Sequence, residues 1–496
     1  MKIIIIIISF LISIPAISQV DDYVPSDEKH QRELYYQAVR NADNVTQLFI
    51  NRDVFNQIPK TIVHFQKLEK LECHTNTSLT EDDILLLQSL PNLKDLDIHG
   101  DVRELPQNLE LLSNIQHLRL HIKMIKIPDC VCKLPQLRRI DLVGDIQYLP
   151  FCFAKMDALR SLNFYFNDFI AFPEVICKIP NLDSLTFSAA SLETVPLSFT
   201  NMKIRYLKVS GLKNDYVANQ VFQLPDLKYL DVNQCKLTEL PENTRIQEIE
   251  EIFFSGSDHF YYDRVFEVFS GFKHLKALNI SGAKFNILGP EISKLTSLEK
   301  LTIIHSSINS ISPEFYSFKK LKYLKLTDNN VIPGNNISNL SALEYLELSD
   351  GHDNFNFNME SVTALKNLKY LSLTDLGIKH IPAKIGDLTN LIELNLSNNK
   401  INTLPLEIGK LSNLEKLKLG ENQFKKLPSE IGELKKMNYL SIPFTNISSL
   451  PETLYDTKNI KMIIGSKFFS TSTIKKIKKT FGEDSLRFPS PPAPRL

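Results

Sequence analysis

The sequence predicts an α/β repeat fold: a right-handed solenoid, curved like a horseshoe, with a concave parallel β-sheet, a convex side of short helices and turns, and helical caps at both ends. One pattern, L-x-x-L-x-L-x-x-N-x-I-x-x-L-P-x-x-I-x-x-L, recurs from residue 42 onward with a mean period of about 23 residues, giving about 18 coils. The chain has 496 residues, more than the roughly 250–300 at which a single core stops growing, and a stack of coils escapes that limit. Both ends depart from the pattern, as the caps of a repeat stack do.

Each coil is expected to contribute one short strand to the sheet. In one of the clearest copies, Leu394 and Leu396 point inward and Asn395 points outward by the alternation of a strand. The residue that follows the strand is interpreted as structural, because its side chain can satisfy backbone groups of neighbouring coils where the chain turns. The residues in this slot are Asn76, Asn167, Cys235, Asn329, Asn399 and Asn422.

The two ends of the chain carry an export signal and two caps. Lys2, the apolar stretch Ile3–Ile14 and the small residues before Gln19 predict a signal peptide that is cleaved after Ser18. The apolar stretch is well short of the roughly 20 residues that a membrane span needs. The predicted parts are 1–18 signal peptide, 19–41 N-terminal helical cap, 42–464 solenoid, 465–488 C-terminal cap and 489–496 proline-rich tail.

Charge and hydropathy narrow the class of partner. Lys plus Arg and Asp plus Glu both number 57, so the basic excess typical of nucleic-acid binding is missing and no nucleic acid is expected. No segment after the signal is long and apolar enough for a transmembrane span. The chain is therefore expected to be secreted, or to lie in the cell envelope or periplasm, after cleavage of the signal peptide.

The six cysteines lie inside the coils. Cys130 and Cys152 occupy the same slot of adjacent coils, two residues past the proline, so a disulfide between them is possible. Cys132 and Cys177 share the next slot but lie two coils apart, at roughly 10 Å, which is too far. The alternative for most of these residues is that they are buried thiols filling small gaps.

The repeats resemble those of a known family. The L-P-x-x-I-G-x-L segments at 404–411 and 427–434 resemble the leucine-rich-repeat superfamily, in the subclass shared with Ras-associated scaffold proteins. The export signal, the helix before Asn44–Ile50 and the cysteine-free caps are more similar to secreted bacterial members. The resemblance implies binding of proteins and no common reaction. Coils between 90 and 155 depart from the pattern, with Asp or Lys in the asparagine slot.

Stacking turns each outward strand position into a column of side chains about 4.8 Å apart. Aromatic residues on a concave, partly wet surface are typical anchors of protein interfaces, although tyrosine is also simply a favourable strand residue. The tyrosines that follow this pattern are Tyr206, Tyr229, Tyr323, Tyr345, Tyr370 and Tyr439.

A second column consists of His74, His99 and His121. Neighbouring imidazoles could share a zinc ion completed by Asp97 or Glu72, or could form a pH-sensitive patch as they protonate near pH 6.5. The outer pair would be roughly 10 Å apart, so the three cannot bind one ion. We interpret them as solvated polar residues of a binding face, and assign no metal and no cofactor.

Three coils, 65–89, 246–271 and 340–364, are longer than the others, and two of them offer a further candidate surface. Coil 246–271 carries three consecutive aromatic residues outside the repeat pattern, Phe260, Tyr261 and Tyr262, and coil 340–364 carries an insertion at 351–357. Extra residues in a solenoid map to loops that often border a binding face. The alternative is that these aromatic side chains fold back onto the core.

Taken together, the sequence predicts a non-enzymatic binding protein that is exported and recognises an extracellular or cell-surface protein through its concave face. The chain contains no phosphate-binding glycine loop, no H-E-x-x-H and no G-x-S-x-G. Two alternatives remain open: an intracellular signalling scaffold like the Ras-associated relatives, and a hydrolase or glycan-active enzyme on the same scaffold. The oligomeric state is not predicted.

Overall fold

The computed structural model describes residues 28–144, 146–165, 169–233, 235, 240, 244–255, 265–284, 286–331, 333–349, 357, 359–457 and 459–488. The predicted signal peptide and proline-rich tail lie outside these residues. The chain forms two compact units, Met1–Lys123 with Lys133–Gln136, and Met124–Cys132 with Leu137–Leu496, called unit 1 and unit 2 below. Among the described residues, no helix combines the length and the apolarity that crossing a bilayer requires.

Unit 1 contains a parallel sheet of four strands, paired in chain order. The strands are β1 (Gln47–Asn51), β2 (Lys70–His74), β3 (Asp95–Gly100) and β4 (His117–Ile122). Its helices are α1 (Glu28–Arg40), α2 (Arg52–Phe55) and α3 (Glu81–Gln88), and its 3-10 helices are η1 (Ala42–Asn44), η2 (Lys60–His64) and η3 (Gln107–Leu111).

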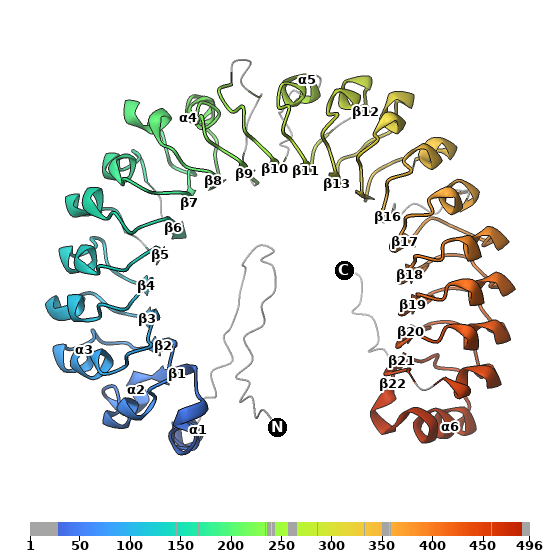
Figure 1. Cartoon of the computed structure of the whole chain (residues 1–496), viewed down its shortest axis with the longest axis horizontal. Helices are drawn as coiled ribbons and strands as arrows, with labels where there is room; N and C mark the ends of the chain where they lie inside the picture. The colour runs from blue at the N-terminus through green and yellow to red at the C-terminus, as the bar shows by residue number, and fades with distance from the viewer. Residues whose placement is uncertain are drawn as a thin grey trace. The chain divides into compact units, whose positions relative to one another are not determined.

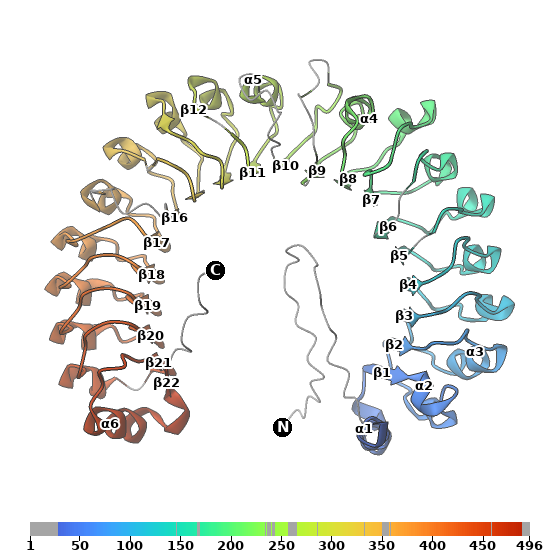
Figure 2. The same ribbon diagram turned by 180° about the vertical axis from the view of Figure 1, so that it is seen from behind.

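Unit 2 repeats the same design over many more coils, with its strands on the inner side of an arc and its short helices on the outer side (Figures 1 and 2). Its strands are β5 (Arg139–Val143), β6 (Ser161–Tyr165), β7 (Ser184–Ser188), β8 (Tyr206–Ser210), β9 (Tyr229–Val232), β10 (Glu251–Ser255), β11 (Ala277–Ser281), β12 (Ile287–Leu288), β13 (Lys300–Ile304), β14 (Ser310–Ile311), β15 (Tyr323–Thr327), β16 (Tyr345–Ser349), β17 (Tyr370–Thr374), β18 (Glu393–Asn395), β19 (Lys416–Lys418), β20 (Tyr439–Ser441), β21 (Met462–Ile464) and β22 (Leu486–Arg487). Its helices are α4 (Asp215–Val221), α5 (Val265–Ser270) and α6 (Thr471–Phe481).

The convex side is built mainly from 3-10 turns of five residues, or six in η12, most of which begin just after a proline or at it. These are η4 (Asp129–Lys133), η5 (Phe151–Lys155), η6 (Glu174–Lys178), η7 (Leu197–Asn201), η9 (Pro290–Lys294), η10 (Pro313–Ser317), η11 (Asn335–Asn339), η12 (Met359–Ala364), η13 (Ala383–Asp387), η14 (Leu406–Lys410), η15 (Ser429–Glu433) and η16 (Glu452–Asp456), with η17 (Glu483–Ser485) before β22. The predicted solenoid fold, with a parallel sheet and a side of short helices, is confirmed.

The core of each coil is filled from both sides. The second and fourth residues of a strand point inward, as Leu371 and Leu373 do, and both are at most 1% exposed. The third residue of a 3-10 turn points inward from the opposite side, as Phe153, Phe199 and Phe315 do with no exposed surface. Burying a large apolar side chain contributes about 1.5–3 kcal/mol, so each coil gains its stability by stacking on its neighbours.

The asparagine slot forms a ladder of buried hydrogen bonds between coils. The Asn399 amide group donates to the carbonyls of Leu373 (2.8 Å) and Leu396 (3.0 Å). Its side-chain oxygen accepts from the backbone N–H groups of Leu376 (3.2 Å) and Ile378 (3.1 Å). Backbone groups at the turn, which the strands leave without partners, are thereby satisfied.

Three further residues of this slot make equivalent contacts. Asn422 donates to the carbonyl of Leu396 (2.8 Å), and Asn329 donates to that of Ile303 (3.0 Å). The Cys235 thiol, in the same slot, approaches the Val209 carbonyl at 3.5 Å and acts as a weak donor there.

The prediction for Asn76 is wrong. Its side chain is exposed and donates to the Asp53 carboxylate (2.6 Å) instead of bonding the backbone of the preceding coil. The adjacent Thr75 is buried in its place, and its hydroxyl donates to the Thr77 carbonyl (2.7 Å), so the longer coil closes its turn with a hydroxyl. Asn167 lies outside the described residues.

Neighbouring 3-10 turns meet in a constant arrangement, in which the fourth residue of one turn faces the second residue of the next. A methyl group at Gly409, fourth in η14, would lie 2.8 Å from the carbonyl oxygen of Glu430, second in η15. Gly386 has the same relation to Glu407. In η13, η14 and η15 the fourth residue is glycine, because the next backbone approaches too closely there for a Cβ atom.

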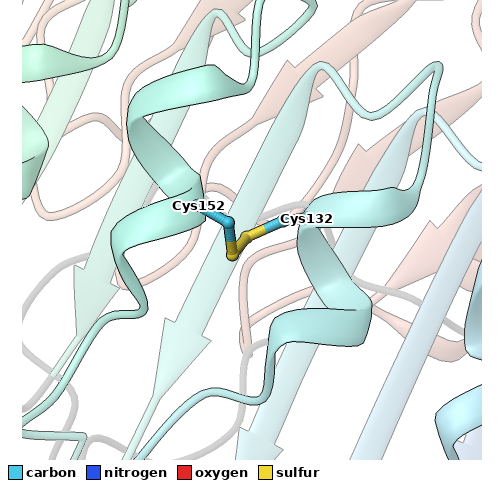
Figure 3. Close-up of a disulfide and its surroundings, with 2 residues drawn as sticks. All are labelled: Cys132 and Cys152. Atoms are coloured by element: carbon cyan, nitrogen blue, oxygen red, sulfur yellow. A yellow bond between two sulfur atoms is a disulfide. The ribbon is translucent and has the colours of Figure 1, made fainter.

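The same arrangement corrects the predicted disulfide. Cys152, second in η5, is bonded to Cys132, fourth in η4, with their Cα atoms 5.9 Å apart (Figure 3). Cys130, second in η4, is a buried thiol that takes no part in this disulfide, so the predicted Cys130–Cys152 pair is wrong. Residues in identical slots are not the ones that face each other, since the turns are offset by two positions.

Counting thiols tests this pairing. Under denaturing, non-reducing conditions the wild-type chain should alkylate at four cysteines. Cys130→Ala should label one fewer, because only a free thiol is removed. Cys132→Ala should label one more, because Cys152 is released, and should lose about 3 kcal/mol of stability. Mass spectrometry of the alkylated chains gives the count, and the reverse result for the two variants would restore the Cys130–Cys152 pair.

Helices cover the first and last strands in their respective units. In unit 1, α1 buries Tyr35, whose hydroxyl lies 2.9 Å from Thr61 Oγ1 and whose ring packs 6.0 Å from that of Phe65. In unit 2, Ser470 caps the N-terminus of α6, and its side chain accepts from the Thr473 N–H (3.1 Å). The apolar edges of β1 and β22 are thus shielded.

Candidate functional site

All six predicted tyrosines lie at the first position of their strands in unit 2. The register places Tyr206 beside Tyr229, and Tyr323, Tyr345 and Tyr370 side by side on three consecutive strands. Tyr439 follows three strands further on, after Glu393 and Lys416 on the two strands between. The remaining strands in this register carry Glu251, Ala277 and Lys300 between the two groups, so the tyrosines belong to one column, called the tyrosine column.

The central group of the tyrosine column is a stack of three rings. The centroids of Tyr323 and Tyr345 lie 4.1 Å apart with their planes at 11°, and Tyr370 follows at 5.9 Å and 38°. Lys300 places its ammonium group 5.2 Å from the Tyr323 centroid, at a distance suited to a cation–π contact. Tyr370 is the most exposed of the three, at 39%.

A carboxylate on the same strand fixes the middle ring. The Tyr345 hydroxyl donates to Glu347 Oε2 (2.5 Å), and Lys325 pairs with the other oxygen of that carboxylate (2.9 Å). Burial and the bond to Glu347 raise the pKa of Tyr345. The ring is therefore held in one orientation as a neutral phenol at physiological pH, which lowers the entropy lost when a ligand packs against it.

The earlier group is a looser pair. The rings of Tyr206 and Tyr229 lie 6.1 Å apart, and Phe253 extends the row at 5.4 Å from Tyr229. Burial, with Asp231 and Glu251 nearby, raises the pKa of Tyr229. Tyr206 is 47% exposed, so this pair also offers aromatic surface to solvent.

The histidine column lies in unit 1, on β2, β3 and β4. His74 is paired with His99, and His99 with His121, as predicted from the coil alignment. The rings of His74 and His99 stack at 4.7 Å, and a ring nitrogen of His121 lies 3.2 Å from one of His99. The predicted neighbours Glu72 and Asp97 lie on the same face, two residues before His74 and His99.

The two carboxylates beside these histidines are in different environments. The His74 side chain lies 3.3 Å from Glu72, and this hydrogen bond lowers the pKa of Glu72. Asp97 is buried and pairs with Arg119 at 3.1 Å. Burial opposes the charged form of His99, but the Asp97 carboxylate outweighs it and the pKa of His99 is raised.

The insertions in the two long coils lie almost entirely outside the described residues. Phe260, Tyr261 and Tyr262 lie outside the described residues, as does the insertion at 351–356. Phe357, at the end of the second insertion, is buried. Sequence reasoning also missed Glu347 and Lys300 as partners of the tyrosine stack, although reading the outward positions of β13 and β16 as columns would have found both.

A comparison with protein families matches residues 346–423 to the family described as "Leucine-rich repeat region". Among curated proteins, adenylate cyclase of the fission yeast Schizosaccharomyces pombe is 25% identical over 252 residues, covering 45% of this chain. The chain spans 14% of the length of that cyclase.

Two solved structures are similar over most of the chain. A leucine-rich-repeat protein of Leptospira interrogans is 24% identical, with 91% of this chain and 98% of that one covered and a TM-score of 0.44. The protein in the TLR13–ssRNA13 complex is 18% identical, with 90% of this chain and 78% of that one covered and a TM-score of 0.58. The second of these likenesses supports the solenoid fold.

Proposed function

Because the chain is a leucine-rich-repeat protein, we propose that it is a binding protein which recognises an extracellular or cell-surface protein through the tyrosine column of unit 2. The observation that carries this proposal is the oriented stack of Tyr323, Tyr345 and Tyr370, which project from the outward-pointing side of the sheet. Leucine-rich-repeat folds are usually non-catalytic, and function on such a scaffold resides in the surface that the coils present.

The stack has the properties of an interface anchor. Tyrosine buries a large area at small entropic cost, because the ring has only two rotatable bonds and its hydroxyl remains hydrogen-bonded. Here Glu347 already holds the Tyr345 hydroxyl, so packing a ligand against the rings leaves no phenol without a partner. Lys300 at the border adds positive charge that favours an acidic rim on the partner.

The double variant Tyr345→Ala/Tyr370→Ala tests the proposal. Each ring is expected to behave as an interface hot spot worth about 2 kcal/mol, so the affinity for the captured protein should fall by more than roughly thirtyfold. The full-length mature chain is immobilised and exposed to extracellular and cell-surface proteins, and captured proteins are quantified by mass spectrometry.

Tyr216→Ala is the matched control, because Tyr216 is 50% exposed but lies on α4, on the outer side of unit 2. Its capture profile should equal that of the wild type, and circular dichroism should be unchanged in all variants. Equal capture by the double variant and the wild type would assign binding to another surface.

We also propose that the chain is exported. The Cys132–Cys152 bond supports this, since structural disulfides persist in oxidising compartments and are rare in the cytosol. It weighs against the intracellular scaffold that the sequence left open. N-terminal sequencing of the protein recovered outside the cytoplasm should begin at Gln19, and an intact Met1 with a reduced Cys132 would favour the scaffold instead.

A further inference from the structure

We propose that Glu72, His74 and His99 bind one divalent transition-metal ion, with zinc as the best match. The site lies on the side of the unit 1 sheet to which the outward-pointing residues of β2 and β3 project. One ligand atom from each of the three side chains lies within 4.8 Å of the others. This proposal revises our interpretation of these histidines as solvated polar residues, and it concerns a site separate from the tyrosine column.

The register of two strands builds the site. Glu72 and His74 are two residues apart on β2, so both point to the same face of the sheet. His99 on β3 is paired with His74, and their rings stack with centroids 4.7 Å apart. The three ligands therefore come from two adjacent strands of a continuous sheet, which is a rigid support for a metal centre.

Asp97 holds His99 in place. Its side chain is 6% exposed, and Arg119 pairs with its Oδ2 atom at 3.1 Å. Its Oδ1 atom lies 2.7 Å from His99 Nε2 and pairs with this ring nitrogen. Histidines that bind a metal commonly pair their other ring nitrogen with a carboxylate, which fixes the orientation of the ring, so this buried pair supports His99 as a ligand.

The ligand chemistry selects the class of ion. Two imidazoles and one carboxylate suit zinc and its neighbours in the first transition series, whereas magnesium and calcium prefer sets made entirely of oxygen. Three protein ligands leave a fourth tetrahedral position open. The side chains of His74 and His99 retain 24% and 22% exposure, so this position faces solvent and can accept a water molecule.

His121 is not among the ligands. It lies one strand beyond His99, and residues two strands apart are separated by roughly 10 Å, too far for His74 and His121 to share bonds of about 2.1 Å. Its ring packs at an angle against that of His99, with centroids 5.1 Å apart. His121 therefore acts as a positioning residue that supports the orientation of His99.

Titration of the tag-free full chain with zinc alone tests the proposal, with calorimetry or a chromogenic chelator as the readout. We expect one tightly bound equivalent. His74→Gln and His99→Gln should each weaken binding by at least about a hundredfold, and Asp97→Asn, which acts through His99, by about 10–100-fold. Cobalt substituted for zinc should give the absorption spectrum of a four-coordinate site, and both His variants should lose that spectrum.

His305→Gln is the matched control. His305 also lies beside a carboxylate, 3.3 Å from Asp328, but it is 67% exposed and belongs to unit 2. This variant should bind zinc as the wild type does, and magnesium should not compete in any of the chains. Thermal melts establish that each variant is folded, and the partly exposed His74 provides a second test if His99→Gln fails to fold.

Two results would overturn the proposal: no saturable zinc binding by the wild-type chain, or equal binding by the wild type and the folded His74→Gln variant. Neither result bears on the protein-binding proposal, because the proposed zinc ligands lie in unit 1 and the tyrosine column lies in unit 2. Conversely, loss of partner capture on replacing Tyr345 and Tyr370 would leave zinc binding unchanged.

Discussion

Replacing Asn399 by leucine is expected to lower the stability of its coil by about 2–6 kcal/mol. The Asn399 side-chain oxygen is the acceptor for two buried N–H groups, those of Leu376 and Ile378. Each N–H that loses its acceptor costs about 1–3 kcal/mol, since the site is closed to water. Two buried carbonyls also lose their donor. The leucine side chain fills a similar volume but cannot replace any of these bonds.

Native-state hydrogen exchange is the appropriate measurement, because a long array of repeats need not unfold in a single transition. Protection should fall at the amides of residues 376–378 and in the adjoining coils, and should be unchanged in unit 1. The control is Asn413→Leu, since Asn413 is only partly buried, donates to the Thr389 carbonyl (2.8 Å) and accepts from the Lys436 ammonium group (2.6 Å). If both variants lost the same protection, the buried ladder would not be the source of stability.

Replacing Arg52 by methionine is expected to destabilise unit 1 by about 3–5 kcal/mol. Arg52 pairs with Asp83 at 2.9 Å, and the side chains of the two residues are 5% and 2% exposed. Removing the guanidinium leaves a carboxylate buried without its counter-charge, which is the costly way to break such a pair. The loss also frees the Ser78 carbonyl, to which Arg52 donates at 3.0 Å.

The double variant Arg52→Met/Asp83→Asn should recover part of this loss, because it removes the uncompensated charge while the amide oxygen can still accept from the buried Ile58 N–H. The surface pair of Lys123 and Asp101 is the control, with 70% and 41% of the two side chains exposed. Lys123→Met should change stability by no more than about 1 kcal/mol. Urea denaturation of all three variants, followed by hydrogen exchange in unit 1, compares them. A loss at Arg52 no larger than at Lys123 would contradict the expectation.

The fold could be predicted from the sequence because each slot of the repeat must meet the same physical requirement in every coil. Leu371 and Leu373 must be apolar to stack, and Asn399 must accept and donate at a turn, so the pattern determines strand, core and ladder together. The same alignment correctly placed the tyrosine and histidine columns, since strands in register keep equal positions adjacent.

Contacts between turns could not be read from the alignment. Equal slots were assumed to face each other, but the 3-10 turns are offset, so Cys152 meets Cys132 and not Cys130. Asn76 failed for a different reason: its coil is longer, and a threonine hydroxyl closes the turn. The buried pair of Arg52 and Asp83 joins two irregular coils and follows no period that a sequence could reveal.

The offset between successive turns also has a mechanical meaning. A stack whose coils contact only their neighbours behaves under load like springs in series, so its compliance is the sum of the compliances of the individual junctions. The bond between η4 and η5 makes the junction of Cys132 and Cys152 inextensible on the outer side of the stack. Under tension or bending, the outer side of unit 2 therefore extends at the junctions without a disulfide, such as the one where Gly409 packs against η15.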